Sequence, residues 1–464
     1  MESNRKEPLK AILVGVQLPK VSDEETVGSL AELSRLVTTL GYNVIAQTSQ
    51  KRKSNRDATV LGDGKLLELA NWTGGTGVVG PLVVKKKSKA AMKFAKNQVE
   101  EPAEEVEESE EEDFEASEAP KEKAEIVIFD CDLSPSQLRN LESATGVTVL
   151  DRTGVIIEIF SRHARTRAAR LQVEIARLTY VAPRLRETGG GDDRGGGGVG
   201  GKGAGESSVE LDRRKIRDRI KELKQELASI SQEHETRRSK RNQEISVALV
   251  GYTNAGKSSL MRALTGSEVL VADKLFATLD TTIRVLYPES KPKILISDTV
   301  GFIKKLPHDL VASFKSTLDE ALNASLLLYV VDSSDPTFRS QLEVTKSVLA
   351  EVGAQEIQSY LVLNKVDRLT LEAQAKLKAE FPEAIFLSAH RKGDVAALRT
   401  RLIENFETGM EDCEFFIPYS TPGAIGEIRS KLRVLAESYN EGGTTLKVRA
   451  HPEQVAKLKA KFDI

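Results

Sequence analysis

Apolar residues in the first third of the chain follow two alternating spacings. Residues 11–16 form a short apolar run typical of a strand, and over residues 30–40 leucine and valine recur at helical spacing. Further strand-like runs lie at residues 44–46, 126–129 and 147–150. Because strands that alternate with helices are typical of α/β folds, this pattern predicts a small α/β domain at residues 9–155.

The next segment has helical spacing that a glycine-rich stretch interrupts. Residues 156–185 predict one helix, and 11 of the 17 residues at 189–205 are glycine, which predicts a flexible loop. Beyond the loop an apolar seam steps by four and three residues through Ile216, Ile220, Leu223, Leu227 and Ile230. We therefore predict an antiparallel helical hairpin at residues 156–243, whose seam packs on the preceding helix. An intermolecular coiled coil is the less favoured alternative, so the chain is expected to be monomeric.

Residues 410–464 combine both spacings again. A strand-like run begins at Phe415, a helical pattern covers residues 426–438, and another strand-like run at 445–448 precedes a final helical pattern. This order predicts a small α+β unit. A chain of 464 residues is long enough for about three domains.

Composition limits the class of protein. Hydrophobic residues make up 40% of the chain, too many for a mostly disordered protein. No apolar run approaches the ~18 residues of a membrane span, and the N-terminus lacks the apolar core of a signal peptide. The two cysteines, Cys131 and Cys413, form neither a disulfide framework nor a zinc cluster. We therefore expect a cytoplasmic protein with no membrane span.

The net charge of -2 hides a strong segregation of charge. Residues 100–125 hold 14 acidic residues and two lysines, whereas the rest of the chain holds 65 basic and 55 acidic residues. The acidic tract belongs to an insertion at about residues 73–124, and we expect this insertion to be disordered. A solvated spacer is the favoured role of the tract, and partner binding or self-masking is the alternative. Residues 162–186 carry seven arginines and one acid, so this basic segment suits a polyanionic partner, and a solvated helix face with intramolecular salt bridges is the alternative.

A phosphate-binding motif follows the apolar strand at residues 245–250. The sequence from Gly251 to Ser258 matches G-x-x-x-x-G-K-[ST], and a helical pattern begins directly after it. In this context backbone N–H groups and a helix N-terminus surround an anionic phosphate. Lys257 would place its charge on the β and γ oxygens, and the Ser258 hydroxyl would ligate Mg²⁺.

Three later strand ends indicate which nucleotide binds. The strand at 294–297 ends in Asp298-Thr-Val-Gly301, where Asp298 would hold the magnesium shell through water and the N–H of Gly301 would meet a γ-phosphate. The strand at 360–363 leads into Asn-Lys-Val-Asp367, whose carboxylate would accept hydrogen bonds from N1–H and the 2-amino group of guanine. Adenine lacks both donors and would leave this carboxylate unpaired. The strand at 385–387 ends in Ser-Ala-His, whose backbone would contact the guanine O6.

Switch I must lie between the phosphate loop and Asp298. We favour Thr278 as the residue that completes the magnesium shell when the γ-phosphate is present, and Thr282 is the alternative. Thr278 and Gly301 are the main candidates for positioning the γ-phosphate or water, and no catalytic residue is assigned with certainty. The residues expected at the nucleotide are Gly251, Tyr252, Thr253, Asn254, Ala255, Gly256, Lys257, Ser258, Phe276, Ala277, Thr278, Leu279, Asp280, Asp298, Thr299, Val300, Gly301, Asn364, Lys365, Val366, Asp367, Ser388, Ala389 and His390.

These motifs resemble G1, G3, G4 and G5 of the translation-factor-related class of P-loop GTPases. The resemblance implies a doubly wound, mostly parallel sheet at residues 244–409, with the ligand beyond the carboxyl ends of the strands. Several longer stretches are similar to the HflX family of ribosome-associated bacterial GTPases. They include GYTNAGKSSL, LFATLDTTIR, DTVGFIKKLPHDLVASFKSTLDEA and LVLNKVD, and outside the G domain TVLGDGKLLEL, VIFDCDLSPSQLRNLE, VLDRTGVIIEIFSRHARTRAARLQVEIARLTYVAPRL and VELDRRKI.

Resemblance to HflX implies a function on ribosomes. Members bind the large ribosomal subunit and its rRNA in a GTP-favoured way and split stalled or inactive ribosomes under stress. The family further implies that the hairpin loop points toward the peptidyl-transferase region and that a variable C-terminal extension contacts protein or RNA. Here the stretch GAGESSVELDRR lacks the proline and the TQ pair that are usual in the family.

Hydrolysis is expected to be slow in the isolated chain. Ras-like enzymes place a water-orienting glutamine after the DxxG glycine, but this chain has Phe302, which cannot hydrogen-bond through its side chain. We therefore predict stimulation by a partner; His308 is a weaker candidate for orienting water. Asn254 stands where some GTPases hold K⁺, so K⁺ dependence is a hypothesis beside the expected Mg²⁺. Two other functions stay open: an NTP-driven RNA-remodelling enzyme that also uses ATP, and a non-ribosomal GTPase scaffold.

Overall fold

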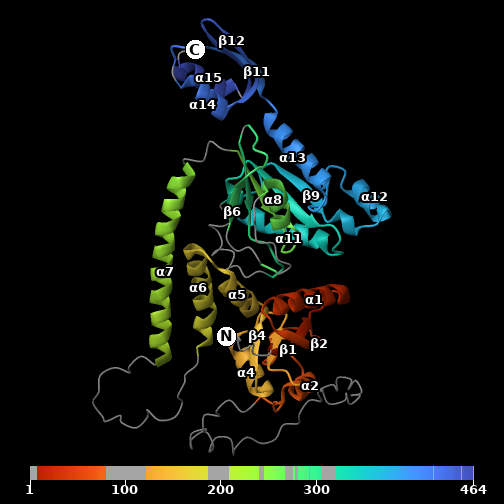
Figure 1. The fold of residues 1–464 in the computed structure, drawn as a ribbon. Coiled ribbons are helices and arrows are strands. Elements are labelled where there is room, and N and C mark those ends of the chain that lie inside the picture. The colour runs from red at the N-terminus through yellow and green to blue at the C-terminus, as the bar shows by residue number, and fades with distance from the viewer. Residues whose placement is uncertain are drawn as a thin grey trace, which may run out of the picture. The chain divides into compact units, whose positions relative to one another are not determined.

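A computed structural model describes most of the chain (Figure 1). The described residues are 8–79, 122–185, 208–239, 245–266, 275–276, 281–291, 293–305, 320–421, 423–450 and 452–462. The chain divides into two compact units, Met1–Ile156 and Ile157–Ile464. The glycine-rich stretch at 189–205, the acidic residues 100–121 and His308 lie outside the described residues.

The first unit contains a four-stranded parallel sheet in the order β2-β1-β3-β4. Its strands are β1 (Lys10–Gln17), β2 (Asn43–Lys51), β3 (Ile126–Phe129) and β4 (Thr148–Asp151), and its helices are α1 (Asp23–Thr39), α2 (Asp63–Thr73), α4 (Pro135–Thr145) and the start of α5 (Arg152–His163). One face of the sheet buries Ile12 and Phe129 against α2 and α4. On the other face Gly15 lies against Leu30 of α1. The sequence predicted these four strands but not α2.

The insertion in this unit is shorter than the expected 73–124. The backbone N–H of Ala124 donates to the carbonyl of Trp72 at 2.8 Å, and Ala124 is buried. The N–H of Gly77 donates to the carbonyl of Ala144 at 2.9 Å. Residues 74–79 and 122–124 are therefore part of the packed domain.

The prediction of a single helix at residues 156–185 is wrong. The chain forms α5, then α6 (Arg167–Val181) and a 3-10 turn, η1 (Ala182–Arg184). The break occurs because Thr166 has extended backbone angles and its hydroxyl accepts a hydrogen bond from the N–H of Ala169, which starts a new helix. The periodicity of apolar residues continues across this cap, so spacing alone did not reveal it.

The helices α6 and α7 (Ser208–Ser239) form the expected antiparallel hairpin. Leu223 of α7 is fully buried against Leu171 and Ile175 of α6, with Ile220, Leu227 and Ile230 around them. Two ion pairs join the helices: Arg167 pairs with Glu226, and Glu174 pairs with Arg219. The earlier residue of α6 thus meets the later residue of α7, as expected for antiparallel helices. The seam therefore packs within the chain, as the favoured interpretation predicted.

The G domain is a six-stranded sheet in the order β10-β9-β8-β5-β7-β6, in which only β6 runs antiparallel among the described strands. The strands are β5 (Ile245–Val250), β6 (Thr282–Val285), β7 (Ile294–Asp298), β8 (Leu326–Asp332), β9 (Ser359–Asn364) and β10 (Ile385–Phe386). The helices are α8 (Lys257–Thr265), α11 (Phe338–Glu351), α12 (Leu371–Glu380) and α13 (Lys392–Glu407), with a 3-10 turn, η2 (Val366–Arg368). Helices α8 and α13 cover one face, and α11 and α12 cover the other. This doubly wound, mostly parallel sheet confirms the predicted fold class.

The C-terminal unit is a three-stranded antiparallel sheet, β11-β13-β12, with two helices on one face. Its elements are β11 (Glu411–Pro418), α14 (Ala424–Lys431), β12 (Arg433–Asn440), β13 (Gly443–Ala450) and α15 (Pro452–Phe462). The prediction of a helix at residues 426–438 is wrong, because α14 ends at Lys431 and the strand β12 follows. Nearly all of β12 is exposed, so it lacks the alternation of buried and exposed residues that would have indicated a strand.

Candidate nucleotide site

The phosphate loop connects β5 to α8 and needs glycine at both ends. Gly256 has a φ of 94°, and a Cβ atom there would lie 2.3 Å from Nδ2 of Asn364. A Cβ atom on Gly251 would lie 2.1 Å from the carbonyl oxygen of Val330. Asn254, with a φ of 60°, is exposed at the outer turn of the loop. The strand, the loop and the helix thus stand in the order that binds phosphate on backbone N–H groups.

Lys257 is buried at the floor of the loop. Its Nζ donates to the carbonyls of Gly251 at 3.0 Å and Tyr252 at 2.8 Å. Burial lowers the pKa of Lys257 to about 8, although the nearby Asp298 carboxylate acts in the opposite direction. Among the residues that the structure describes, the ammonium group has carbonyl partners but no ion pair with a carboxylate, which suits it to meet a phosphate.

Asp298 ends β7 beside the loop and suits a magnesium shell. Its Oδ2 accepts a hydrogen bond from the Ser258 hydroxyl at 2.6 Å. Its Oδ1 is buried and has no hydrogen-bond partner among the residues that the structure describes. Burial raises the pKa of this carboxyl, although Lys257, the Ser258 hydroxyl and the backbone of Thr299 favour its charged form. A buried carboxylate oxygen without a partner, next to a serine hydroxyl, is the donor set that Mg²⁺ and its waters prefer.

Nucleotide affinity should fall as the pH rises above about 8. Bound phosphates favour charged Lys257, whereas the empty site loses this proton near pH 8, so binding above that pH must take up a proton. The affinity for GDP should then fall by up to about tenfold per pH unit. Calorimetry at about pH 7 and about pH 9, in buffers of different ionisation heats, measures the affinity and the proton uptake. Lys257→Arg keeps its charge throughout and should remove the slope; equal wild-type affinities at both pH values would contradict the prediction.

The G3 segment is joined to the phosphate loop through the backbone of Phe302. Its N–H donates to the Gly251 carbonyl at 3.1 Å, and its carbonyl accepts from the N–H of Thr253 at 2.8 Å. A Cβ atom on Gly301 would lie 2.8 Å from the Cα of Thr253, so only glycine allows this approach. The Phe302 ring is buried, and Thr299 and Val300 are buried beside Asp298. Phe302 therefore holds the G3 segment against the loop through its backbone.

The structure describes only part of the expected switch I. Phe276 has a φ of 57° and a buried side chain, whose ring packs edge-on against Phe160 with centroids 4.6 Å apart. The expected residues Ala277, Thr278, Leu279 and Asp280 lie outside the described residues. Thr282, the alternative magnesium ligand, begins β6 and is paired in register with Asp298.

The G4 and G5 residues meet the phosphate loop and each other. Nδ2 of Asn364 donates to the Ala255 carbonyl at 2.9 Å, and its Oδ1 accepts from the N–H of Ala389 at 3.1 Å. Asp367 is exposed, and a hydrogen bond from the Ser388 hydroxyl holds the pKa of its carboxyl below the usual value. The Asp367 carboxylate thus stays charged and accessible at the point where the motif order places the base. Val366 is buried beneath it, and His390 is exposed nearby.

Two residues around the site, Asp394 and Asp332, were not predicted from the sequence. Asp394 accepts a hydrogen bond from the N–H of Ser388 at 2.8 Å. Asp332, at the end of β8, pairs with Lys365. Of these two, only Asp332 had a signal in the sequence, because it ends a buried strand as Asp298 does. The predicted Tyr252 accepts a hydrogen bond through its hydroxyl from the N–H of Lys304 at 2.6 Å.

Comparisons with known proteins cover nearly the whole chain. Family models match residues 28–88 and 73–161 (GTP-binding GTPase N-terminal), residues 163–241 (GTP-binding GTPase Middle Region) and residues 246–365 (50S ribosome-binding GTPase). The GTPase HflX of Gluconacetobacter diazotrophicus is 59% identical over 459 residues, which cover 99% of each chain. The GTPase HflX of Caldanaerobacter subterraneus is 36% identical over 99% of this chain and 95% of its own. A crystal structure of a GTP-binding protein from Sulfolobus solfataricus in complex with GDP is 23% identical, with a TM-score of 0.40, over 85% of this chain and 99% of that chain.

Proposed function

The chain belongs to the HflX family of P-loop GTPases, which hydrolyse GTP, and from this premise we propose that it is a nucleotide-dependent switch on the large ribosomal subunit. In the proposed cycle the GTP-bound chain associates with the subunit and its rRNA, splits stalled or inactive ribosomes under stress, and leaves after hydrolysis. The matched family model over residues 246–365, described as a 50S ribosome-binding GTPase, supports this proposal.

The proposed chemistry uses the site described above. Lys257 and the N–H groups of the phosphate loop bind and orient the phosphates, and Asp367 selects guanine. Ser258, Thr278 and the water-coordinating Asp298 would hold Mg²⁺, which supplies positive charge at the β and γ oxygens when bound. Since the Phe302 side chain offers no hydrogen bond to water, we propose that the ribosome completes the catalytic arrangement and accelerates hydrolysis. K⁺ binding near Asn254 stays a prediction that rates in K⁺ and Na⁺ would test.

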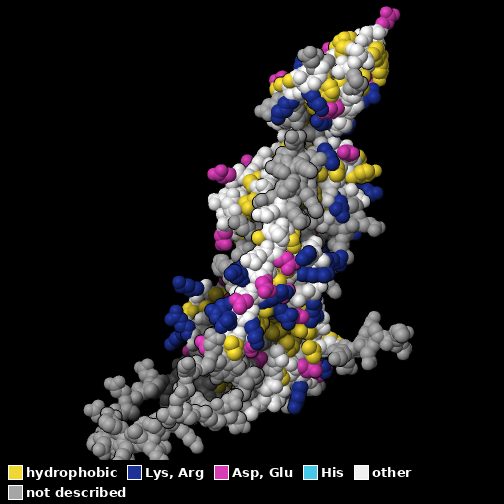
Figure 2. Space-filling view, turned by 90° about the vertical axis from the view of Figure 1, so that its left-hand side faces the viewer, with side chains coloured by type: hydrophobic (Ala, Val, Ile, Leu, Met, Phe, Trp, Pro, Cys, Tyr) yellow, Lys and Arg dark blue, Asp and Glu magenta, His cyan; other side chains and the backbone are white. Residues whose placement is uncertain are grey.

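The single observation that carries the ribosomal proposal best is an unneutralised basic face on α7. Figure 2 shows Lys and Arg side chains gathered over this helix, with acidic side chains among them. Some of the basic side chains of α7 are paired, as Lys215 is with Asp212 and Arg219 with Glu174. Arg217, Lys221 and Lys224 are exposed and form no ion pair with any residue that the structure describes.

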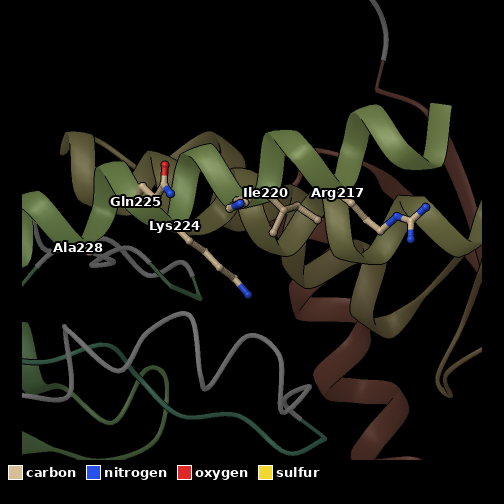
Figure 3. Close-up of a pocket in the computed structure, with 6 residues that line it drawn as sticks. Arg217, Ile220, Lys224, Gln225 and Ala228 are labelled. Carbon is tan, nitrogen blue, oxygen red and sulfur yellow. The ribbon is translucent and has the colours of Figure 1, made fainter. Parts of the chain in front are cut away.

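These three cations share one side of the helix. They stand four and three residues apart, so they project from neighbouring turns of α7. With Ile220, Gln225 and Ala228 they line a shallow hollow of about 460 Å³. Figure 3 shows Arg217 and Lys224 extending from the same side of α7, with Ile220 between them. Such a row of cations around a small apolar floor fits a sugar–phosphate backbone.

Sedimentation with purified large subunits tests the proposed function. We expect the chain to co-sediment with a non-hydrolysable GTP analogue and not with GDP or ATP, and subunits to raise its rate of GTP hydrolysis. Arg217→Glu, Lys221→Glu and Lys224→Glu together should weaken binding by about 10²-fold or more and make its salt dependence shallower. Lys221→Glu alone has a matched control in Lys215→Glu, the same charge change about 120° around α7 from Lys221, which should change binding less than about twofold. Equal binding with GDP and the GTP analogue, or none with either, would refute the proposal.

No helix among the described residues is both long and apolar enough to cross a bilayer. The proposal also includes a cytoplasmic location, which the family supports, and a monomeric state, which the packing of α7 on α6 within the chain supports.

A further inference from the structure

The turn after β8 contacts the first two residues of the G4 motif. Oδ2 of Asp332 accepts a hydrogen bond from Nζ of Lys365 at 2.7 Å, and both side chains are 15% exposed. The next residue, Ser333, is buried, and it donates to the carbonyl of Asn364 from its N–H at 3.0 Å and from its hydroxyl at 2.6 Å. Asp332 and Ser333 therefore hold the first two residues of the Asn-Lys-Val-Asp motif.

The Asp332 carboxylate is itself fixed in orientation. Its Oδ1 accepts hydrogen bonds from the N–H of Ser334 at 3.0 Å and from the Ser334 hydroxyl at 2.6 Å. These two bonds leave Oδ2 directed at Lys365. Lys365 in turn has a left-handed backbone with a φ of 62°, so its position depends on contacts rather than on an intrinsic preference.

Lys365 also contacts the phosphate loop. Its Nζ also donates to the carbonyl of Asn254 at 2.8 Å. Because a trans peptide group is planar, its N–H points opposite to its carbonyl. Holding the Asn254 carbonyl on Lys365 fixes the N–H of Ala255 on the other side of the peptide group, where it donates to the Tyr252 carbonyl with an N–O distance of 3.4 Å. Asn364 acts on the next peptide in the same way, since it holds the Ala255 carbonyl.

We propose that Asp332 is a positioning residue for nucleotide binding, which acts through Lys365 to turn the backbone N–H groups of the phosphate loop toward the phosphates. Asp332 does not touch the nucleotide in this arrangement. Its effect falls on the α- and β-phosphates that GDP and GTP share, so it contributes equally to the ground state and the transition state. The proposal rests on nucleotide binding at this loop and does not depend on the ribosomal partner.

Asp332→Asn should raise the Kd for GDP and the KM for GTP by about tenfold, because it removes a charge-assisted hydrogen bond, and should leave kcat within about twofold. Selectivity for GDP over ADP should be unchanged, since Asp367 still contacts the base. Asp335→Asn is the matched control in the same turn: its carboxylate accepts hydrogen bonds from Thr337 and Gln341 at the start of α11, and its loss should leave nucleotide affinity unchanged.

A double-mutant cycle with Lys365→Met separates positioning from a general loss of structure. If Asp332 acts through Lys365, Asp332→Asn should change GDP affinity less than about twofold in the Lys365→Met background. An equal loss in both backgrounds, or an unchanged Kd in the single variant, would overturn the proposal. A lower kcat with unchanged KM would do the same. Wild-type protein that fails to bind GDP would refute the nucleotide site itself, a separate outcome.

Discussion

Asp367→Asn should lower the affinity for GTP and GDP by about 10³-fold or more. The carboxylate at this position would accept two hydrogen bonds from guanine, at N1–H and the 2-amino group. An asparagine amide has one oxygen that accepts and one N–H₂ group that donates. Its N–H₂ group would therefore face a donor of guanine, and neither of these two donors would have an acceptor. The change keeps the size of the side chain and acts on the pairing alone.

Xanthine nucleotides supply the control for this variant. Xanthine carries an oxygen where guanine carries the 2-amino group, so the asparagine N–H₂ group can donate to it. Asp367→Asn should therefore bind xanthosine diphosphate better than GDP, which a variant that merely fails to fold cannot do. Competition of both diphosphates against a fluorescent nucleotide measures this reversal. GDP affinity within about fivefold of the wild type would show that Asp367 does not select the base.

The sequence interpretation succeeded where the determinants are local. A phosphate loop is one continuous segment, so the glycines, Lys257 and the strand before them predict its conformation together. The G4 contacts are different in kind, because Lys365 meets Asn254 and Asp332 only after the sheet brings β5, β8 and β9 side by side. No spacing in the sequence encodes that meeting, although the strands that became β5 and β9 were predicted.

The two errors in secondary structure have different physical origins. Ile428, Leu432 and Leu435 stand four and three residues apart, which favours a helix, yet pairing with β13 draws residues 433–440 into a strand. Such pairing depends on residues distant in the sequence, and it overrides a weak local propensity. At residues 164–166 the opposite holds: a local cap at Thr166 interrupts an apolar spacing that continues through it.

Arg152→Met should destabilise the first unit by about 3–5 kcal/mol. Arg152 is 1% exposed and lies between two carboxylates, with Nη1 2.6 Å from Oδ1 of Asp130 and Nη2 in contact with Glu32. Burial alone would lower the pKa of Arg152, but these two carboxylates raise it, so the guanidinium stays charged. Ser29 donates to the other oxygen of Asp130 at 2.5 Å. Removing the arginine leaves two buried carboxylates close together without their cation.

The single tryptophan of the chain, Trp72, lies against the core of this unit, so its fluorescence during urea unfolding measures the effect. Arg162→Met is the matched control in the same helix. Arg162 pairs with Glu158 at 3.0 Å on the surface, and its loss should change the free energy of unfolding by under about 1 kcal/mol. GDP binding by Arg152→Met should persist, which would separate local destabilisation from global unfolding.

The buried ions themselves need not be a net source of stability. Desolvation of three charges opposes their mutual attraction, so the large effect of Arg152→Met would come from the two carboxylates left unpaired. Neutralising all three, as Glu32→Gln, Asp130→Asn and Arg152→Met together, should therefore recover more than half of the lost free energy of unfolding. A triple variant as unstable as Arg152→Met would instead show that the packing of the long arginine stem holds the start of α5 on the sheet, and that the charges contribute little.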